Sequence, residues 1–124
     1  MFLPIKIYCD SLTKEFDLIP SERKDVLNKI TQYISNQRLE NKPVNLVYIC
    51  THNSRRSHFS QVWAQVAANY YKVNNVNTFS GGTEATAFNI NAINALKKIG
   101  FDIKPINEDK NASYNLFYDE NEKP

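Results

Sequence analysis

Apolar residues form two kinds of pattern along this chain, a continuous run and a helical repeat, and together these patterns predict a mixed α/β domain. Val44 to Cys50 is a nearly continuous apolar run, typical of a strand that is buried on both faces of a parallel sheet. After a short polar stretch, apolar positions recur every three or four residues, which predicts a helix over about Arg56 to Lys72: Phe59, Val62, Trp63, Val66, Ala67 and Tyr70. Strand, loop and helix form half of a parallel βαβ unit.

The second half of the unit follows directly. Val76 to Ser80 predicts a second strand, which ends at a tight turn, Gly81-Gly82-Thr83. Asn89 is the expected N-cap of a second helix and Gly100 its C′ residue, with inward positions at Ile90, Ala92, Ile93 and Leu96. Tyr114 to Tyr118 is apolar enough for a further strand. This order predicts a doubly wound parallel sheet.

The N-terminal third reads differently. Residues 1–19 show no sustained period, and we expect them to be irregular. Ser21 is a plausible N-cap for an amphipathic helix over about Glu22 to Leu39, which Asn41-Lys42-Pro43 ends. We therefore divide the chain into an N-terminal helical extension, residues 1–43, and an α/β domain, residues 44–124.

Length and composition exclude several classes of protein. The 124 residues suit one domain, and 42% hydrophobic with 23% charged residues is ordinary for a globular protein. No apolar run approaches the ~20 residues of a membrane span, so no membrane partner is expected. The N-terminus lacks the basic leader and cleavage site of a signal peptide. We expect a cytoplasmic location.

Charge and cysteine content limit the kinds of ligand and reactive group that we expect in this chain. A formal net charge of +2 predicts no nucleic-acid partner, whereas the dense pair Arg55-Arg56 beside Cys50 indicates a small anionic ligand. Two cysteines, Cys9 and Cys50, fit a reduced compartment with one functional thiol better than a disulfide framework, which leaves Cys9 a bystander. The histidines lack metal-ligand spacing, so no metal and no cofactor are predicted.

The segment Cys-Thr-His-Asn-Ser-Arg-Arg-Ser, residues 50–57, carries the candidate chemistry. A loop between a strand and a helix N-terminus points free backbone N–H groups at a tetrahedral oxyanion. Cys50 would lie at the floor of this cradle, and the planar guanidinium of Arg56 would grip two ligand oxygens. The predicted oxyanion-binding residues are Thr51, His52, Asn53, Ser54, Arg55, Arg56 and Ser57.

The same environment activates the thiol. A cysteine at a helix N-terminus beside arginine can have its pKa lowered from ~8.5 to ~3.5–7.5, which makes it a thiolate at neutral pH. A thiolate under a bound phosphoester can attack in line and form a thiophosphoryl intermediate. The alternative interpretation of Cys50 is a buried strand cysteine without function. Because Arg56 and Ser57 follow Cys50 at this spacing, we favour the interpretation that Cys50 is a nucleophile.

The pattern Cys-x5-Arg-Ser between a strand and a helix resembles the low-molecular-weight protein tyrosine phosphatase family and the thioredoxin-coupled arsenate reductases that share its fold. The segment 78–84 (Thr-Phe-Ser-Gly-Gly-Thr-Glu) and the helix from Asn89 are similar to the family too, so the match covers about 44–103. The resemblance implies a phosphotyrosine phosphatase I-like parallel sheet of about four strands. It also implies that Cys50 is the nucleophile, that Arg56 clamps the oxyanion, and that Asn53, Ser57 and Ser80 brace the loop.

Three features depart from the family pattern. Arg55 replaces a frequent second cysteine, and His52 stands where glycine is common. No Asp-Pro pair supplies the family's general acid, and Asp102, Asp109 and Asp119 are better read as surface residues. The acid and the reductases' resolving cysteines would lie beyond Pro124, so we expect the α/β domain to be incomplete at its C-terminus.

Three hypotheses for function remain. The first is a cysteine-dependent phosphatase that hydrolyses phosphomonoesters, phosphotyrosine among them, of a small molecule or a phosphoprotein. The second is an arsenate reductase that uses Cys50 as nucleophile, with arsenate and a thiol reductant as partners. The third is an oxyanion-binding module without turnover.

Overall fold

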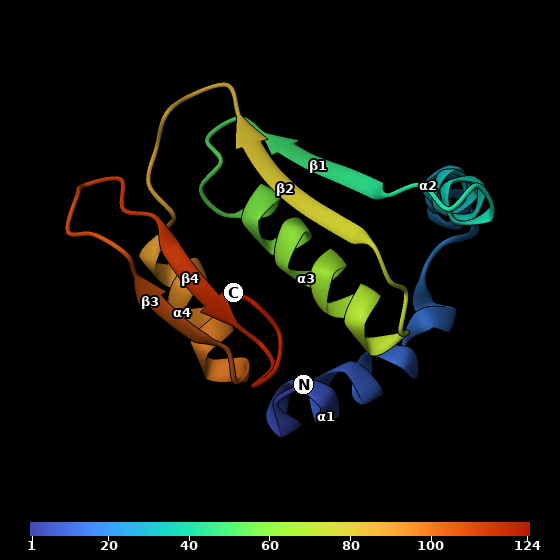
Figure 1. Cartoon of the computed structure of the whole chain (residues 1–124), viewed down its shortest axis with the longest axis horizontal. Helices are drawn as coiled ribbons and strands as arrows, with labels where there is room; N and C mark the ends of the chain where they lie inside the picture. Colours follow the sequence, from blue (N-terminus) through green and yellow to red (C-terminus); the bar gives the residue numbers. More distant parts are fainter.

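The computed structural model describes residues 1–124 and confirms an α/β fold built on a parallel strand pair (Figure 1). Strands β1 and β2 pair in register from Val44↔Val76 to Cys50↔Gly82. Because α3 connects them, both strands end at the same edge, and the loop after β1 lies there. The elements are α1 (Leu3–Thr13), a 3-10 turn (Phe16–Leu18), α2 (Ser21–Leu39), β1 (Val44–Cys50), α3 (Arg56–Tyr70), β2 (Val76–Gly82), α4 (Ile90–Ile99), β3 (Asp102–Pro105) and β4 (Tyr114–Phe117).

The parallel sheet is smaller than the sequence suggested. Of the four strands, only β1 and β2 are parallel, while β3 and β4 form a separate antiparallel pair from Asp102↔Phe117 to Pro105↔Tyr114. The expected single sheet of about four parallel strands is therefore wrong. Strand β3 escaped prediction because four residues ending in proline are too few to show a period.

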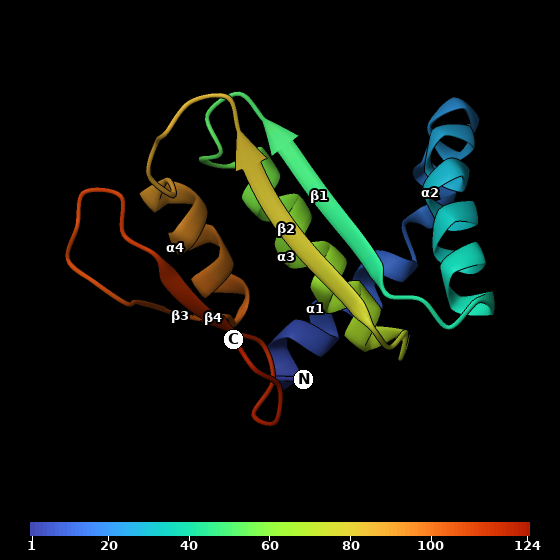
Figure 2. The same cartoon turned by 45° about the horizontal axis from the view of Figure 1, so that its top comes forward.

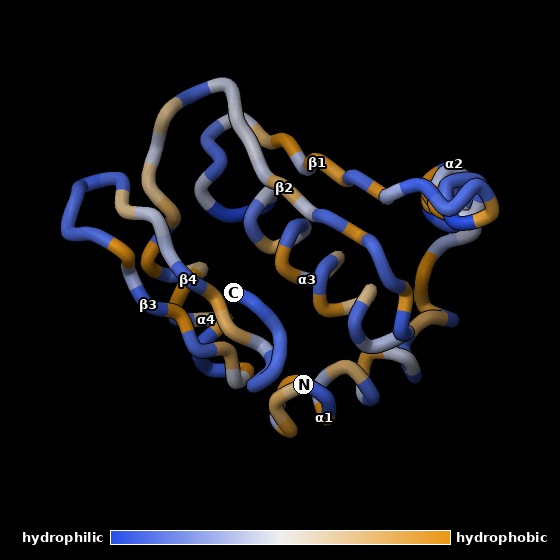
Figure 3. Tube along the Cα trace, viewed as in Figure 1, coloured by the Kyte–Doolittle hydropathy of each residue, from blue (hydrophilic) through white to orange (hydrophobic).

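Only one face of the β1–β2 sheet is covered. Helix α3 packs beneath both strands, and no element lies over the opposite face (Figures 1 and 2). Val47, Ile49 and Phe79 are consequently 60%, 70% and 49% exposed, and apolar colour runs along β1 in Figure 3. The prediction that β1 is buried on both faces is wrong, because burial alternates along the strand.

Helix α1 overturns the expectation that residues 1–19 are irregular. Leu3–Thr13 is helical, with Pro4 in its first turn, where a missing N–H costs nothing. Ile5 and Cys9, one turn apart, are 0% and 8% exposed and join the core of α3, α4 and β3, which includes Val66, Ile93, Leu96, Phe101, Ile103 and Tyr118. The helix also fixes the C-terminal segment, since the Phe2 amide donates to the Tyr118 carbonyl at 2.7 Å.

Helix α2 forms where the sequence predicts it but packs weakly. None of its residues is buried, and its apolar side chains Val26, Leu27, Ile30 and Tyr33 stay 37–50% exposed. It stands beside the start of β1, away from the core (Figure 2). It ends before Asn41, whose φ of 54° is tolerated by asparagine. Neither α2 nor any other helix is long and apolar enough to cross a bilayer.

Candidate active site

The loop between β1 and α3 places Cys50 under the first turn of a helix, as the sequence predicted. Asn53 takes a left-handed conformation with φ of 46°, which turns the chain back over the strand end. Arg55 is the N-cap of α3 and provides no side-chain cap. The amides at this end of the helix are therefore not capped by a side chain, and the Cys50 sulfur accepts from the amides of Ser57, Asn53 and Ser54 instead.

A chain of hydrogen bonds joins the sulfur to the loop. The Cys50 thiol donates to Ser57 Oγ at 3.1 Å, and the Ser57 hydroxyl donates to Asn53 Oδ1 at 2.7 Å. Ser57 is the sole buried polar residue, at 2% exposed. A buried hydroxyl needs partners on both sides. Because both hydrogen bonds share Ser57 Oγ, they hold Cys50 Sγ and Asn53 Oδ1 on either side of this hydroxyl.

These groups lower the pKa of the Cys50 thiol to about 6. The largest cause is the Ser57 hydroxyl, which turns its one proton from Asn53 to the sulfur when the thiol ionises and so stabilises the thiolate, and partial burial opposes it. The backbone amides of Ser57, Asn53 and Ser54 also favour the charged form. The hydroxyl and amides, rather than the arginine charge that the sequence suggested, account for the low pKa.

The sulfur lies in a cavity of about 520 Å³, large enough for a tetrahedral oxyanion. Its walls come from Cys50, His52, Ser54, Arg55, Arg56 and Thr86. Both arginines thus share a cavity with the thiol, and both are exposed to solvent. An anion in this space would meet two guanidinium groups beside the thiol.

Three of the predicted oxyanion-binding residues, Thr51, Asn53 and Ser57, do not line the cavity. The Thr51 carbonyl accepts bonds from the amides of Thr83 and Glu84, at 2.9 and 3.1 Å. Asn53 and Ser57 hold the sulfur as described above. Ser80 lies 3.4 Å from His58 Nδ1 and makes no hydrogen bond to the loop, so the expected bracing role is not seen as a contact.

Glycine at position 82 allows the end of β2 to touch the loop. A Cβ atom there would lie 2.7 Å from the Asn53 amide nitrogen and 3.0 Å from the Cys50 carbonyl oxygen. Both neighbours are backbone atoms, which cannot move without reshaping the cradle. Gly82 is therefore more than the simple turn residue that the sequence indicated.

The segment after β2 supplies residues that the sequence analysis missed. Glu84 pairs with His52 at 3.2 Å, and the Thr86 hydroxyl donates to the His52 carbonyl. Their place immediately after a parallel strand was the available signal, because both strands end at one edge. The three aspartates considered earlier do not line the cavity. Asp102 pairs with Lys104, and Asp119 with the terminal amine.

A cysteine of low pKa at the end of a parallel strand, in a cavity with two arginines, is an arrangement suited to thiol chemistry on a tetrahedral oxyanion. The chain matches three curated proteins, each called arsenate reductase, over about half its length. It is 40% identical to the protein of Brevibacillus brevis over 65 residues, 39% to that of Bacillus subtilis over 66, and 37% to that of Bacillus cereus over 65.

The matched region spans 52% of this chain and 45%, 42% and 45% of those relatives, so the chain covers less than half of their length. No family model matches the chain. No solved structure matches it either. Similarity to these three relatives agrees with the resemblance noted from the Cys-x5-Arg-Ser pattern.

Proposed function

We propose that this chain reduces arsenate, with Cys50 as the nucleophile. The observation that carries the proposal is a thiol of pKa about 6 in an oxyanion-sized cavity with two arginines. Similarity to three arsenate reductases favours arsenate over other tetrahedral anions. Arg56 would clamp the oxyanion and the loop amides would hold its oxygens.

The first step forms a covalent adduct. The Cys50 thiolate attacks arsenic, a sulfur–arsenic bond forms, and an arsenate hydroxyl leaves as water after it takes a proton from solvent. Arg55 and Arg56 offset the negative charge of the anion as it approaches the thiolate. At pH 7 most of the thiol is already ionised, so no general base is needed.

The second step needs another thiol. Its sulfur attacks Cys50 Sγ, a disulfide forms, and the sulfur–arsenic bond breaks with its electron pair on arsenic, which leaves as arsenite. Cys9 does not suit this role, because it is 8% exposed in the core and burial raises its pKa. It also lies on α1, at the opposite end of α3 from the loop (Figure 1). The electrons therefore have to come from a thiol outside residues 1–124.

Arsenite formation by the full chain with dithiothreitol tests this proposal. Cys50→Ser should reduce the rate to background, whereas the matched variant Cys9→Ala should keep it once folding is verified by circular dichroism. Equal rates for Cys50→Ser and wild type would contradict the proposal. The free thiols fit a reducing compartment, and we place the activity in the cytoplasm.

Phosphomonoester hydrolysis is the second candidate, because phosphate has the shape and charge of arsenate and fits the same cavity. No carboxyl group lines that cavity to protonate a leaving group. We therefore expect turnover of p-nitrophenyl phosphate, a good leaving group, but slow hydrolysis of phosphotyrosine. Anion binding without either reaction would leave the binding module as the function.

A further inference from the structure

The segment that follows β2 holds His52 in the wall of the candidate active-site cavity. The His52 carbonyl accepts a hydrogen bond from the Thr86 hydroxyl. One residue earlier, the Thr51 carbonyl accepts from the amides of Thr83 and Glu84 at 2.9 and 3.1 Å. These bonds join two loops that are more than thirty residues apart in sequence. They fix the stretch of backbone that carries the imidazole ring of His52.

The side chain of His52 is held as well, and its contact decides which ring nitrogen can take up a proton. His52 Nε2 lies 3.2 Å from Glu84 Oε2, and each side chain is 57% exposed. A carboxylate only accepts hydrogen bonds, so Nε2 carries the proton in this pair. Nδ1 of the neutral ring is then bare, and it is the nitrogen that gains a proton when the ring becomes charged.

Two positive and two negative groups act on this ring. Arg55 and Arg56 share the cavity wall with His52 and oppose a further positive charge there. The Cys50 thiolate in the same wall and the Glu84 carboxylate favour one. The remaining wall residues are neutral. Because these influences oppose each other, one additional charge in the cavity can decide whether the ring is protonated.

A bound oxyanion brings that charge. The cavity of about 520 Å³ is about 10 Å across, so every group in its wall lies within about one Debye length of an ion inside it. A doubly charged anion therefore favours the protonated form of His52 through its charge, and this effect does not require direct contact with the ring.

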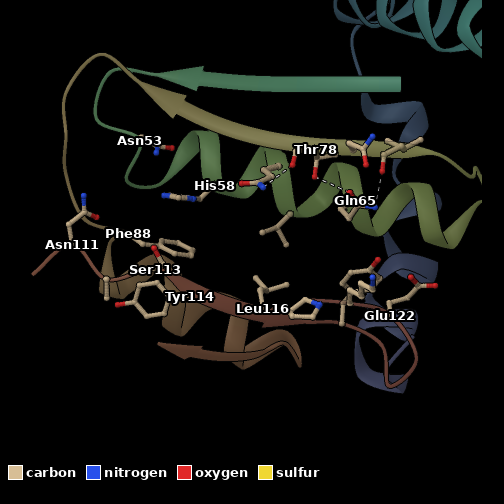
Figure 4. A pocket seen from close by; sticks show the side chains of 18 of the residues that line it. Asn53, His58, Gln65, Thr78, Phe88, Asn111, Ser113, Tyr114, Leu116 and Glu122 are labelled. Atoms are coloured by element: carbon tan, nitrogen blue, oxygen red, sulfur yellow. Dashed lines mark hydrogen bonds between the residues drawn. The ribbon is translucent and has the colours of Figure 1, made fainter. Parts of the chain in front are cut away.

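The second histidine of the chain lies elsewhere and offers an internal comparison. His58 lines a larger cleft of about 880 Å³, between α3 with β2 on one side and β4 on the other (Figure 4). Its ring stacks on Phe88 with ring centres 4.1 Å apart, and burial lowers its pKa. His58 does not line the Cys50 cavity. We therefore expect it to stay neutral when an anion enters that cavity.

We propose that His52 takes up a proton from solvent when a doubly charged oxyanion enters the Cys50 cavity, and that it returns this proton when the anion leaves. The inference rests on the proposed function, because it concerns proton uptake at the same site. The added proton binds Nδ1, while Glu84 keeps the Nε2–H group in place. Since binding takes up a proton, affinity for the anion rises as the pH falls. The imidazolium offsets the negative charge that the anion brings close to the Cys50 thiolate.

Sulfate is the probe for this proposal, because it stays doubly charged at neutral pH and does not titrate there. All proteins in the test carry Cys50→Ser, which removes the thiol that titrates at a pKa of about 6. Calorimetry at constant ionic strength should show sulfate affinity about tenfold higher at pH 6 than at pH 8. His52→Gln should abolish this dependence, and the matched variant His58→Gln should keep it. The same dependence without His52, or no sulfate binding at either pH, would overturn the proposal.

Nuclear magnetic resonance detects the proton directly, since the chain has two histidines. At constant pH 7, sulfate should move the ring signals of His52 toward their imidazolium position and leave those of His58 unchanged. His52→Gln assigns the two sets of signals. If this response is seen while wild type forms no arsenite, the proton-linked site stands and the proposed function fails. If arsenite forms but the His52 signals do not respond to sulfate, the function stands and the proton uptake is wrong.

Discussion

The two ends of helix α3 lie in regions of unlike character. At the N-terminal end, Arg56 and Ser57 adjoin a polar loop that holds a reactive sulfur. At the C-terminal end, Val66 is 1% exposed, and Tyr70 donates from its hydroxyl to Asp10 of α1. That carboxylate raises the pKa of Tyr70 to about 12.

One end of α3 therefore contributes mainly to the stability of the fold, and the other end to the reactivity of Cys50. Hydrophobic burial stabilises the end near α1, whereas hydrogen bonds to a thiol set the chemistry at the other. Substitutions at the two ends should therefore have separable effects. The first prediction below perturbs the buried end, and the next two perturb the loop at the reactive end.

Ile5→Ala should have the largest effect on stability. Ile5 is 0% exposed in the core, and its truncation leaves a cavity that costs about 2–5 kcal/mol of unfolding free energy. Urea denaturation measures the loss. In the fraction that remains folded, the pKa of Cys50 from the pH dependence of alkylation should stay near 6. A shift at Cys50 would show that the two ends are coupled.

Ser57→Ala should act at the opposite end. Loss of the strongest hydrogen bond to the thiolate should raise the pKa of Cys50 by about one to two units. In wild type, alkylation by iodoacetamide should rise with pH through about 6 and then level, because the thiolate is the reactive form. In the variant the rise should come at higher pH. An unshifted profile would mean that the loop amides alone hold the thiolate.

Gly82→Ala should give the smallest of the three effects, measured as weaker binding of an anion by the loop. The new methyl group would displace the Asn53 amide from the cradle. Inorganic phosphate should then protect Cys50 from alkylation about tenfold less well. Gly81→Ala is a matched control, because a Cβ there meets nothing within 4 Å. Equal protection in both variants would contradict the close packing of β2 on the loop.

The sequence predicted the β1–loop–α3 unit well because several local signals agree there. The apolar run stops at Cys50, the polar loop is short, and the apolar stripe of α3 extends over four turns. The second helix was equally clear, since Asn89 caps it through bonds to the amides of Asn91 and Ala92, and Gly100 follows with φ of 132°. Of its expected inward positions, Ala92, Ile93 and Leu96 are buried, whereas the prediction for Ile90 is wrong, because this first residue of the helix is 61% exposed. Position within such a unit was enough to bring Cys50, Arg55 and Arg56 to one cavity.

Features that depend on tertiary contacts were not predictable. Helix α1 spans only 11 residues, which is marginal in isolation, and contacts between Ile5 and distant residues stabilise it. Helix α2 has a clear amphipathic pattern, yet this pattern did not reveal that its apolar side would remain exposed. The pairing of Glu84 with His52 depends on how two loops meet, which no local period encodes.

Gln61 and Gln65 of α3, which donate to carbonyls of β2, have a consequence for self-association. A free strand edge normally invites a second chain to pair with it. Here Gln61 and Gln65 already occupy the carbonyls of Thr78 and Val76, so a strand that adds at this edge must first break two hydrogen bonds. The outer edge of β1 has no strand beside it. Fibrillar growth of this chain should therefore begin at β1 rather than at β2.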